Sequence, residues 1–127
     1  MGTILVIDDE KVVLSVIETA LTKYGHRVEI AEDGAEGIKK FEEGMFDIVI
    51  TDLIMPNSDG NSVVHHIRNS KRKRTPIIGI SGTPWLSDKI GLDRILAKPF
   101  PLRILIDAIE NLSSSITHHD FSEALPH

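Results

Sequence analysis

Short apolar runs alternate along the chain with longer segments that are apolar on one side only. Because apolar residues recur every three or four positions in the longer segments, we expect helices at residues 12–24, 34–43, 61–69 and 101–112. Gly25 suits the end of the first helix, Asp33 the N-cap of the second and Pro101 the first turn of the last. The short runs predict five strands, at Thr3–Ile7, Arg27–Ala31, Phe46–Thr51, Pro76–Ile80 and Arg94–Ala97.

The alternation of strands and helices predicts an α/β fold. Strands that are apolar almost throughout are typical of a parallel sheet covered by helices on both faces, so we expect a small doubly wound domain. We place this domain at residues 1–117 and expect residues 118–127 to form a flexible tail. In such sheets, ligands bind beyond the carboxyl ends of the strands, which directs attention to the residues at those ends.

Composition limits the classes of function. The chain has 127 residues, of which 41% are hydrophobic and 26% charged, as is usual for a globular domain. It has no cysteine, which excludes disulfides and thiolate metal sites. The net charge of −5 argues against direct binding to nucleic acid. No apolar run approaches the ~20 residues that span a bilayer, and the first residues do not resemble a signal peptide, so we expect a cytoplasmic protein without membrane contact.

Polar side chains follow four of the five predicted strands. Asp8 and Asp9 follow the first strand, Asp52 the third, Ser81 the fourth and Lys98 the fifth. Since the carboxyl ends of parallel strands lie at one edge of the sheet, these side chains are expected to converge. The residues after the second strand are assigned to the cap of the next helix.

Three converging carboxylates require compensation. Two unit charges ~4 Å apart repel by about 4 kcal/mol at an effective dielectric constant of ~20. Either one carboxyl group is protonated or a cation lies between them. Oxygen ligands without Cys or His favour a hard ion, Mg²⁺ or Mn²⁺. Taken alone, Asp8, Asp9 and Glu10 are best interpreted as caps of the following helix, but the presence of Asp52 and Lys98 favours a metal site. Together, Asp52, Lys98 and Ser81 supply a nucleophile, a counter-charge and a hydroxyl donor for phosphoryl transfer.

Three segments carry a more specific resemblance. Ile4–Glu10, Thr51–Gly60 and Lys98–Phe100 resemble, in order, the signature segments of two-component response-regulator receiver domains. The resemblance covers residues 3 to about 112. It implies a flavodoxin-like fold in which five parallel strands have the order 2-1-3-4-5.

The resemblance also implies roles for particular residues. Asp52 resembles the phospho-acceptor. Asp9 resembles a direct Mg²⁺ ligand, Asp8 a ligand that acts mainly through water, and the backbone carbonyl of Ile54 the third protein ligand. Together with Asp52, these groups form the expected metal site.

Other residues resemble the phosphate-binding and switch groups of the family. Lys98 resembles the residue that pairs with the acceptor and its phosphate, and Ser81 resembles the switch hydroxyl. The family commonly has a cis bond before the proline that follows this lysine, which we expect here before Pro99.

Two departures from the family pattern concern the output of the domain. Only 17 residues separate Ser81 from Lys98, about five fewer than usual, so we expect a fourth helix that is short or absent. Ile95 stands where the family has its switch aromatic residue.

The leading hypothesis is a phospho-acceptor that receives its phosphoryl group from a histidine kinase or phosphotransfer protein and switches a protein-interaction surface. It is expected to be no enzyme towards other molecules, and to be a monomer or an atypical dimer. A phosphorylation-independent binding module is the alternative. An aspartate-nucleophile phosphatase is disfavoured because position 54 is Ile rather than a second Asp. The basic run Lys71–Arg74 is interpreted as a solvated helix end, with a docking patch for an acidic partner as the alternative.

Overall fold

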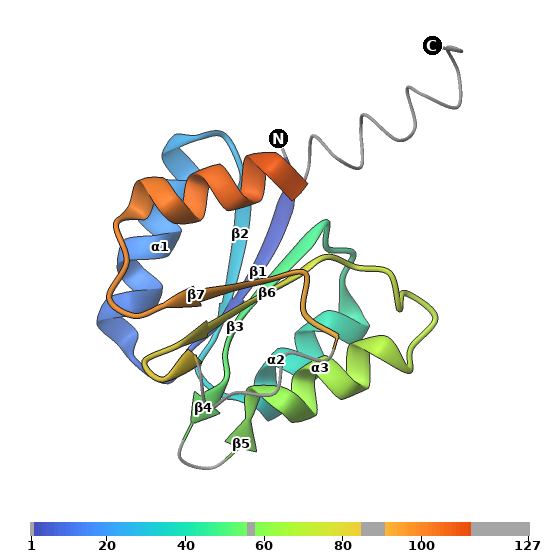
Figure 1. Ribbon diagram of the computed structural model, residues 1–127. Coiled ribbons are helices and arrows are strands. Elements are labelled where there is room, and N and C mark those ends of the chain that lie inside the picture. Colours follow the sequence, from blue (N-terminus) through green and yellow to red (C-terminus); the bar gives the residue numbers. More distant parts are fainter. Residues whose placement is uncertain (1, 56–57, 85–90, 113–127) are drawn as a thin grey trace, which may run out of the picture.

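Five parallel strands form the central sheet of the protein. The computed structural model describes residues 2–55, 58–84 and 91–112. The sheet has the order β2-β1-β3-β6-β7 (Figure 1), which is the predicted order 2-1-3-4-5 when only the strands of this sheet are counted. The strands are β1 (Thr3–Ile7), β2 (Arg27–Ala31), β3 (Ile48–Asp52), β6 (Ile77–Ser81) and β7 (Arg94–Ala97).

Helices cover both faces of the sheet. The helices are α1 (Lys11–Lys23), α2 (Gly34–Glu43), α3 (Gly60–Arg68) and a C-terminal helix at residues 102–112. In Figure 1, α1 and the C-terminal helix lie on one face, while α2 and α3 lie on the other. The predicted flavodoxin-like α/β fold is therefore confirmed.

The alternation of side chains along β1 builds two hydrophobic cores. Ile4 and Val6 belong to the core under α1 and the C-terminal helix. Leu5 and Ile7 belong to the core under α2 and α3, which also contains Phe41. Successive side chains of a strand point to opposite faces, so a strand that is buried on both faces needs an apolar residue at every position.

Local sequence signals fix the ends of the first two helices. At the end of α1, the His26 N–H donates to the Leu21 carbonyl over 3.1 Å and the Gly25 N–H to the Thr22 carbonyl over 3.0 Å. This is the Schellman arrangement, and its glycine has a φ of 89°. At the start of α2, the Asp33 carboxylate accepts from the Glu36 N–H over 2.8 Å, as its predicted role as N-cap requires.

Some predicted boundaries differ from the structure. β3 and β6 begin and end one or two residues later than predicted, so that Asp52 and Ser81 are the last residues of their strands. The segment predicted as a loop after Asp52 contains a two-stranded antiparallel pair, β4 (Ile54–Met55) with β5 (Ser58–Asp59). Two-residue strands are too short to produce a hydrophobic period. The predictions about the fourth helix and the tail fall largely on residues 85–90 and 113–127, which lie outside the described residues.

The basic run behaves as a solvated turn at three of its four positions. Lys71, Lys73 and Arg74 are exposed, whereas Arg72 is half-buried. The Arg72 guanidinium lies 4.6 Å from the centre of the Phe41 ring and donates to the Phe41 carbonyl over 2.6 Å. Arg72 therefore joins the turn after α3 to the end of α2. In the part of the chain that the structure describes, no helix combines the length and apolarity needed to cross a membrane.

Candidate functional site

The carboxyl ends of four neighbouring strands bring the candidate residues to one edge of the sheet. Asp8 directly follows β1, Asp52 and Ser81 end β3 and β6, and Lys98 directly follows β7. The register aligns Asp52 with Ile80 of β6, and Ser81 with Ala97 of β7. The backbone thus fixes the starting point of each side chain.

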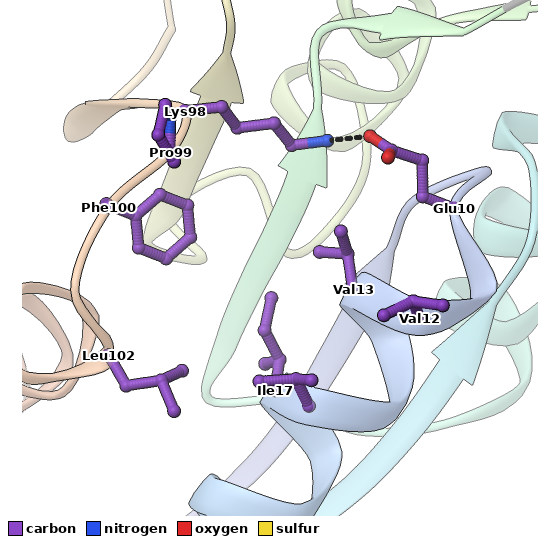
Figure 2. Close-up of a pocket in the computed structure, with 9 residues that line it drawn as sticks. Glu10, Val12, Val13, Ile17, Lys98, Pro99, Phe100 and Leu102 are labelled. Carbon is purple, nitrogen blue, oxygen red and sulfur yellow. Dashed lines mark hydrogen bonds and ion pairs between the residues drawn. The ribbon is translucent and has the colours of Figure 1, made fainter.

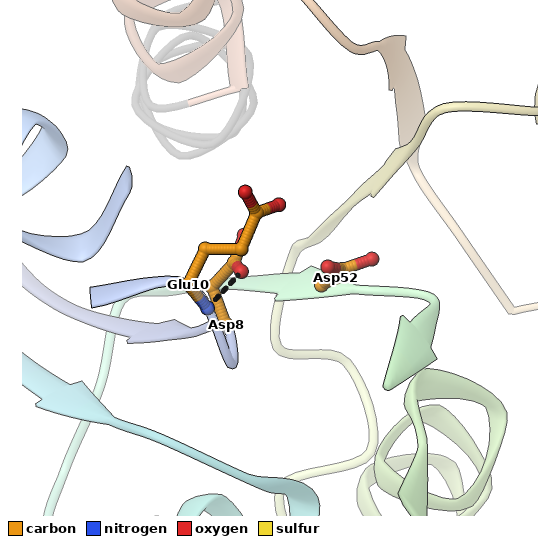
Figure 3. Close-up of side chains that lie close together, drawn as sticks. All are labelled: Asp8, Glu10 and Asp52. Atoms are coloured by element: carbon orange, nitrogen blue, oxygen red, sulfur yellow. Dashed lines mark hydrogen bonds between the residues drawn. The ribbon is translucent and has the colours of Figure 1, made fainter. Parts of the chain in front are cut away.

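The Lys98 ammonium lies among three carboxylates. Its Nζ atom is 2.8 Å from Glu10 Oε1, 2.9 Å from Asp8 Oδ2 and 3.1 Å from Asp52 Oδ2. Figure 2 shows Lys98 reaching from the loop after β7 towards Glu10, and Figure 3 shows Asp8 and Glu10 opposite Asp52. One carboxylate oxygen from each acid lies within 4.8 Å of the other two. In this structure, the compensation expected from the sequence comes from the lysine.

Asp52 is buried but keeps both carboxylate oxygens in contact with donors. Its residue exposure is 5%. Oδ1 accepts from the Ile54 N–H over 3.1 Å, and Oδ2 accepts from Lys98 Nζ over 3.1 Å. These contacts hold the carboxylate at the rim of the sheet, where a reacting group can reach it.

Asp8 is more deeply buried and less well satisfied. Its Oδ1 atom accepts from the Glu10 N–H over 2.9 Å. Its Oδ2 atom is buried and forms no hydrogen bond. The Lys98 ammonium, 2.9 Å away, forms an ion pair with it. Burial raises the pKa of Asp8, and this effect exceeds the opposing effects of the Glu10 N–H and Lys98.

Lys98 stays charged in this environment. Burial acts to lower the pKa of its ammonium group, but the hydrogen bonds to Glu10 and Asp52 and the ion pair with Asp8 together raise it above the ordinary value. The peptide bond between Lys98 and Pro99 is cis, as the family resemblance led us to expect.

Ser81 is fully buried beside this cluster. Its Oγ atom accepts from the Thr83 N–H over 3.0 Å, and its carbonyl accepts from the Lys98 N–H over 2.8 Å. Ser81 thus connects the end of β6 with both the following loop and the residue that carries the ammonium.

The acidic cluster differs in one member from the set expected from the sequence. Its acids are Asp8, Glu10 and Asp52, whereas Asp9 is exposed. The sequence suggested either a helix cap or a metal site for Asp8, Asp9 and Glu10 together and gave Glu10 no role of its own; its side chain makes no capping hydrogen bond to α1. Only its adjacency to the Asp-Asp pair could have indicated its place here. The roles of Asp9 and of the Ile54 carbonyl as metal ligands remain predictions.

An apolar groove adjoins the cluster. It has a volume of about 460 Å³ and is lined by side chains of α1 and of residues 98–102. Figure 2 shows Val13 and Ile17 of α1 facing Phe100 and Leu102 across this groove. Val12, on its rim, is 77% exposed. Glu10 and Lys98 line both the groove and the acidic cluster.

The residues of the cluster fit a hard divalent cation. All the clustered side-chain donors are carboxylate oxygens, the type of ligand that Mg²⁺ prefers. The buried Asp8 Oδ2 atom without a hydrogen bond offers such an ion an additional ligand or a contact through water.

Comparison with known proteins places the chain in a family. The model of the response regulator receiver domain matches residues 4–110. The response regulator TrrA of Thermotoga maritima, solved in complex with Mg²⁺-BeF, has a TM-score of 0.81 and 33% identity, covering 88% of this chain and 99% of TrrA. The receiver domain of the Pseudomonas aeruginosa sensor histidine kinase PA1611, solved with a magnesium ion in its active site cleft, has a TM-score of 0.81 and 29% identity, covering 87% of this chain and 96% of that domain.

Curated relatives show the same domain alone and within longer proteins. Protein PilG of Pseudomonas aeruginosa is 35% identical over 123 residues, which cover 92% of this chain and 91% of PilG. The transcription factor SKN7 of Saccharomyces cerevisiae is 34% identical over 102 residues, which cover 76% of this chain but only 16% of SKN7. The chain spans less than half the length of most of the curated relatives that it matches. With the family model matching most of its length, the chain belongs to the response regulator receiver domains of two-component signalling.

Proposed function

We propose that this receiver domain accepts a phosphoryl group on Asp52. The observation that carries the proposal is the arrangement of Asp52 at the carboxyl edge of the sheet, 5% exposed and 3.1 Å from the Lys98 ammonium. A carboxylate nucleophile beside a fixed cation is the minimum that phosphoryl transfer requires.

The transfer is an in-line displacement at phosphorus. A carboxylate oxygen of Asp52 forms the new O–P bond, while the P–N bond of a donor phosphohistidine breaks and its electron pair stays on the imidazole nitrogen, which then takes a proton. Lys98 offsets negative charge on the phosphoryl oxygens, and the Ser81 hydroxyl donates its proton to one of them while its oxygen accepts from the Thr83 N–H. Hydrolysis of the acyl phosphate by water restores the carboxylate and releases phosphate.

Mg²⁺ is the proposed cofactor. Asp8, Asp9, Asp52 and the carbonyl of Ile54 would hold it, with Glu10 close by. When bound, the ion supplies neutralising charge for the carboxylates and the phosphoryl oxygens. The solved complexes of TrrA with Mg²⁺-BeF and of the PA1611 receiver domain with a magnesium ion support this choice. Substitution by Mn²⁺ rests on ligand chemistry alone.

The proposed phosphodonor is a histidine kinase or a phosphotransfer protein. The apolar groove between α1 and residues 98–102 supports a protein donor, because it shares Glu10 and Lys98 with the acidic cluster and exposes Val12. An exposed apolar surface that continues into a reactive site is typical of a protein contact. A Val12→Asp substitution should slow phosphorylation by a kinase but not by acetyl phosphate.

We infer that phosphorylation switches a protein-interaction surface. The Ser81 oxygen accepts from the Thr83 N–H in the loop after β6, so a rotation of the hydroxyl that aims its proton at a phosphoryl group would be transmitted to the start of that loop. Because Ile95 replaces the switch aromatic, the change need not follow the usual route in the family. The domain is its own substrate and acts on no other molecule.

Labelling with radioactive acetyl phosphate tests the proposal. We expect acid-stable, alkali-labile label on the wild-type protein with Mg²⁺, and none with EDTA or in Asp52→Asn. Label on Asp52→Asn would move the acceptor elsewhere. Failure of the wild type to become labelled by acetyl phosphate or by a kinase, with Mg²⁺ bound, would favour the phosphorylation-independent binding module instead.

A further inference from the structure

Glu10 occupies a position between the acidic cluster and solvent. Its side chain is 59% exposed. It leaves the start of α1 and reaches Lys98, whose Nζ atom donates to Oε1 over 2.8 Å (Figure 2). This is the shortest of the three contacts between the ammonium and the carboxylates. The roles proposed for Asp52, Asp8 and Asp9 do not account for it.

Three carboxylates already surround the ammonium. A lysine ammonium has three protons to donate, and three carboxylate oxygens already lie within 3.1 Å of Nζ. A phosphoryl group on Asp52 brings further oxygen atoms to the same ammonium. These oxygens compete with the carboxylates that already surround Nζ, so a contact that lengthens when Asp52 is phosphorylated makes the ammonium more available to the phosphoryl group.

The exposures of the three acids indicate which contact gives way. The side chains of Asp8 and Asp52 are 1% and 7% exposed, so neither carboxylate can recover hydration if it loses the lysine. Leaving a buried charge unpaired is strongly unfavourable. Glu10 can return to water, and breaking an exposed ion pair costs little.

We propose that Glu10 is a positioning residue that holds Lys98 in the unphosphorylated domain and releases it to the phosphoryl group. The proposal rests on the proposed function of Asp52 as phospho-acceptor. It assigns Glu10 an opposing effect: the Glu10 carboxylate competes with the phosphoryl oxygens for the Lys98 ammonium. A weaker hold should therefore favour the phosphorylated state.

The test compares Glu10→Gln and Glu10→Asp with the wild type. Glutamine removes the charge, whereas aspartate keeps the charge but shortens the side chain by one carbon–carbon bond of about 1.5 Å, which withdraws the carboxylate from Nζ. The matched control is Glu32→Gln, because Glu32 also forms an exposed ion pair, with Lys11 over 3.7 Å. Two quantities are measured for each variant: the rate of labelling by acetyl phosphate at saturating Mg²⁺, and the affinity for Mg²⁺ without a phosphodonor.

We expect both Glu10 variants to become labelled about twofold to fivefold faster, the range that corresponds to one partly exposed ion pair. Glu10→Asp should keep the Mg²⁺ affinity of the wild type, which also shows that its acidic pocket is intact, and Glu32→Gln should behave as the wild type. Unchanged or slower labelling of Glu10→Asp would overturn the proposal. So would a loss of Mg²⁺ affinity in Glu10→Asp, since Glu10 would then act as a metal ligand. If the wild type itself is not labelled, the proposed function fails instead.

Discussion

Replacing Asp8 with asparagine should make the metal-free domain more stable. The Asp8 side chain is 1% exposed, and its Oδ2 atom has no hydrogen bond. Asparagine keeps an oxygen that can accept from the Glu10 N–H, as Asp8 Oδ1 does over 2.9 Å. The substitution therefore removes the buried charge with little change in shape.

The magnitude follows from three opposing contributions. At an effective dielectric constant of ~20, the Lys98 ammonium 2.9 Å away attracts the Asp8 carboxylate by about 6 kcal/mol. Asp52, within 4.8 Å, repels it by about 3 kcal/mol, and the more exposed Glu10 repels it less. Burial of the ion costs several kcal/mol more. Repulsion and burial together outweigh the attraction, in agreement with the raised pKa of Asp8. We expect a gain of about 1–2 kcal/mol at neutral pH, or about 3–6 °C in Tm.

Urea unfolding in EDTA between pH 3.5 and 8 measures this gain. Because the folded-state pKa of Asp8 lies above its unfolded value of 3.8, Asp8 favours the folded state of the wild type below pH 3.8, and this contribution is lost as the pH rises through the folded-state pKa. The advantage of Asp8→Asn should thus be small at pH 3.5 and grow towards pH 8. Asp107→Asn, at an exposed position of the C-terminal helix, is the control and should change little.

Two results would refute this reasoning. If Asp8→Asn is less stable than the wild type in EDTA at pH 7, the ion pair with Lys98 outweighs burial. If both proteins gain equal stability from Mg²⁺, Asp8 does not contribute to the metal site, since the stabilisation by a ligand increases with the logarithm of its affinity for the folded state.

Three further predictions concern other positions. Gly91 has a φ of 84°, and a Cβ atom there would lie 2.8 Å from Val64 Cγ1. Gly91→Ala should therefore lower the free energy of unfolding in urea by about 1–2 kcal/mol. The control Gly82→Ala should be nearly neutral, because a Cβ atom at that position meets nothing within 4 Å. Burial lowers the pKa of His26 below 6.5, so the stability of the wild type should fall as the pH drops through 6.5 towards the folded-state pKa. His26→Gln should flatten this part of the curve of stability against pH, and an unchanged slope would contradict the role of His26. Lys98→Met should lower stability by about 1–3 kcal/mol at pH 7, with a smaller loss at pH 4, and should slow labelling of Asp52; a variant that is more stable at pH 7 would show that the acids do not need this counter-charge.

Most of the fold could be predicted because its signals are local. The apolar runs of β1 and β7, the alternating residues of β2 and the glycine that ends α1 lie within a few residues of what they specify. The strand-end rule then placed Asp52 and Lys98 at one edge without knowledge of any contact. The antiparallel pair β4–β5 was missed because two residues per strand carry no period.

The unpredicted contacts are long-range contacts of flexible side chains. Glu10 is 88 residues from Lys98 in the sequence, and Arg72 is 31 residues from Phe41. The sequence indicated no contact between Glu10 and Lys98, and for Arg72 it favoured solvation at a helix end. Such side chains have several rotatable bonds, and only the assembled tertiary structure selects the rotamer that makes the contact.

The cluster of Asp8, Glu10 and Asp52 around Lys98 is not the most stable arrangement for this edge of the sheet. Replacing a buried ion pair with apolar residues is often neutral or stabilising, so stability alone does not explain why three acids share Lys98. Their arrangement does have a consequence for the pocket: with one cation and three anions, the ionised cluster carries a net negative charge that a divalent cation can neutralise. Lys98 limits the repulsion among the three carboxylates. Because Glu10 is partly exposed, the lysine can move away from it without leaving a buried charge unpaired. Apolar residues in place of the whole ionic cluster would make a more stable sheet. Asp52 would then have no counter-ion that can move from one carboxylate to another.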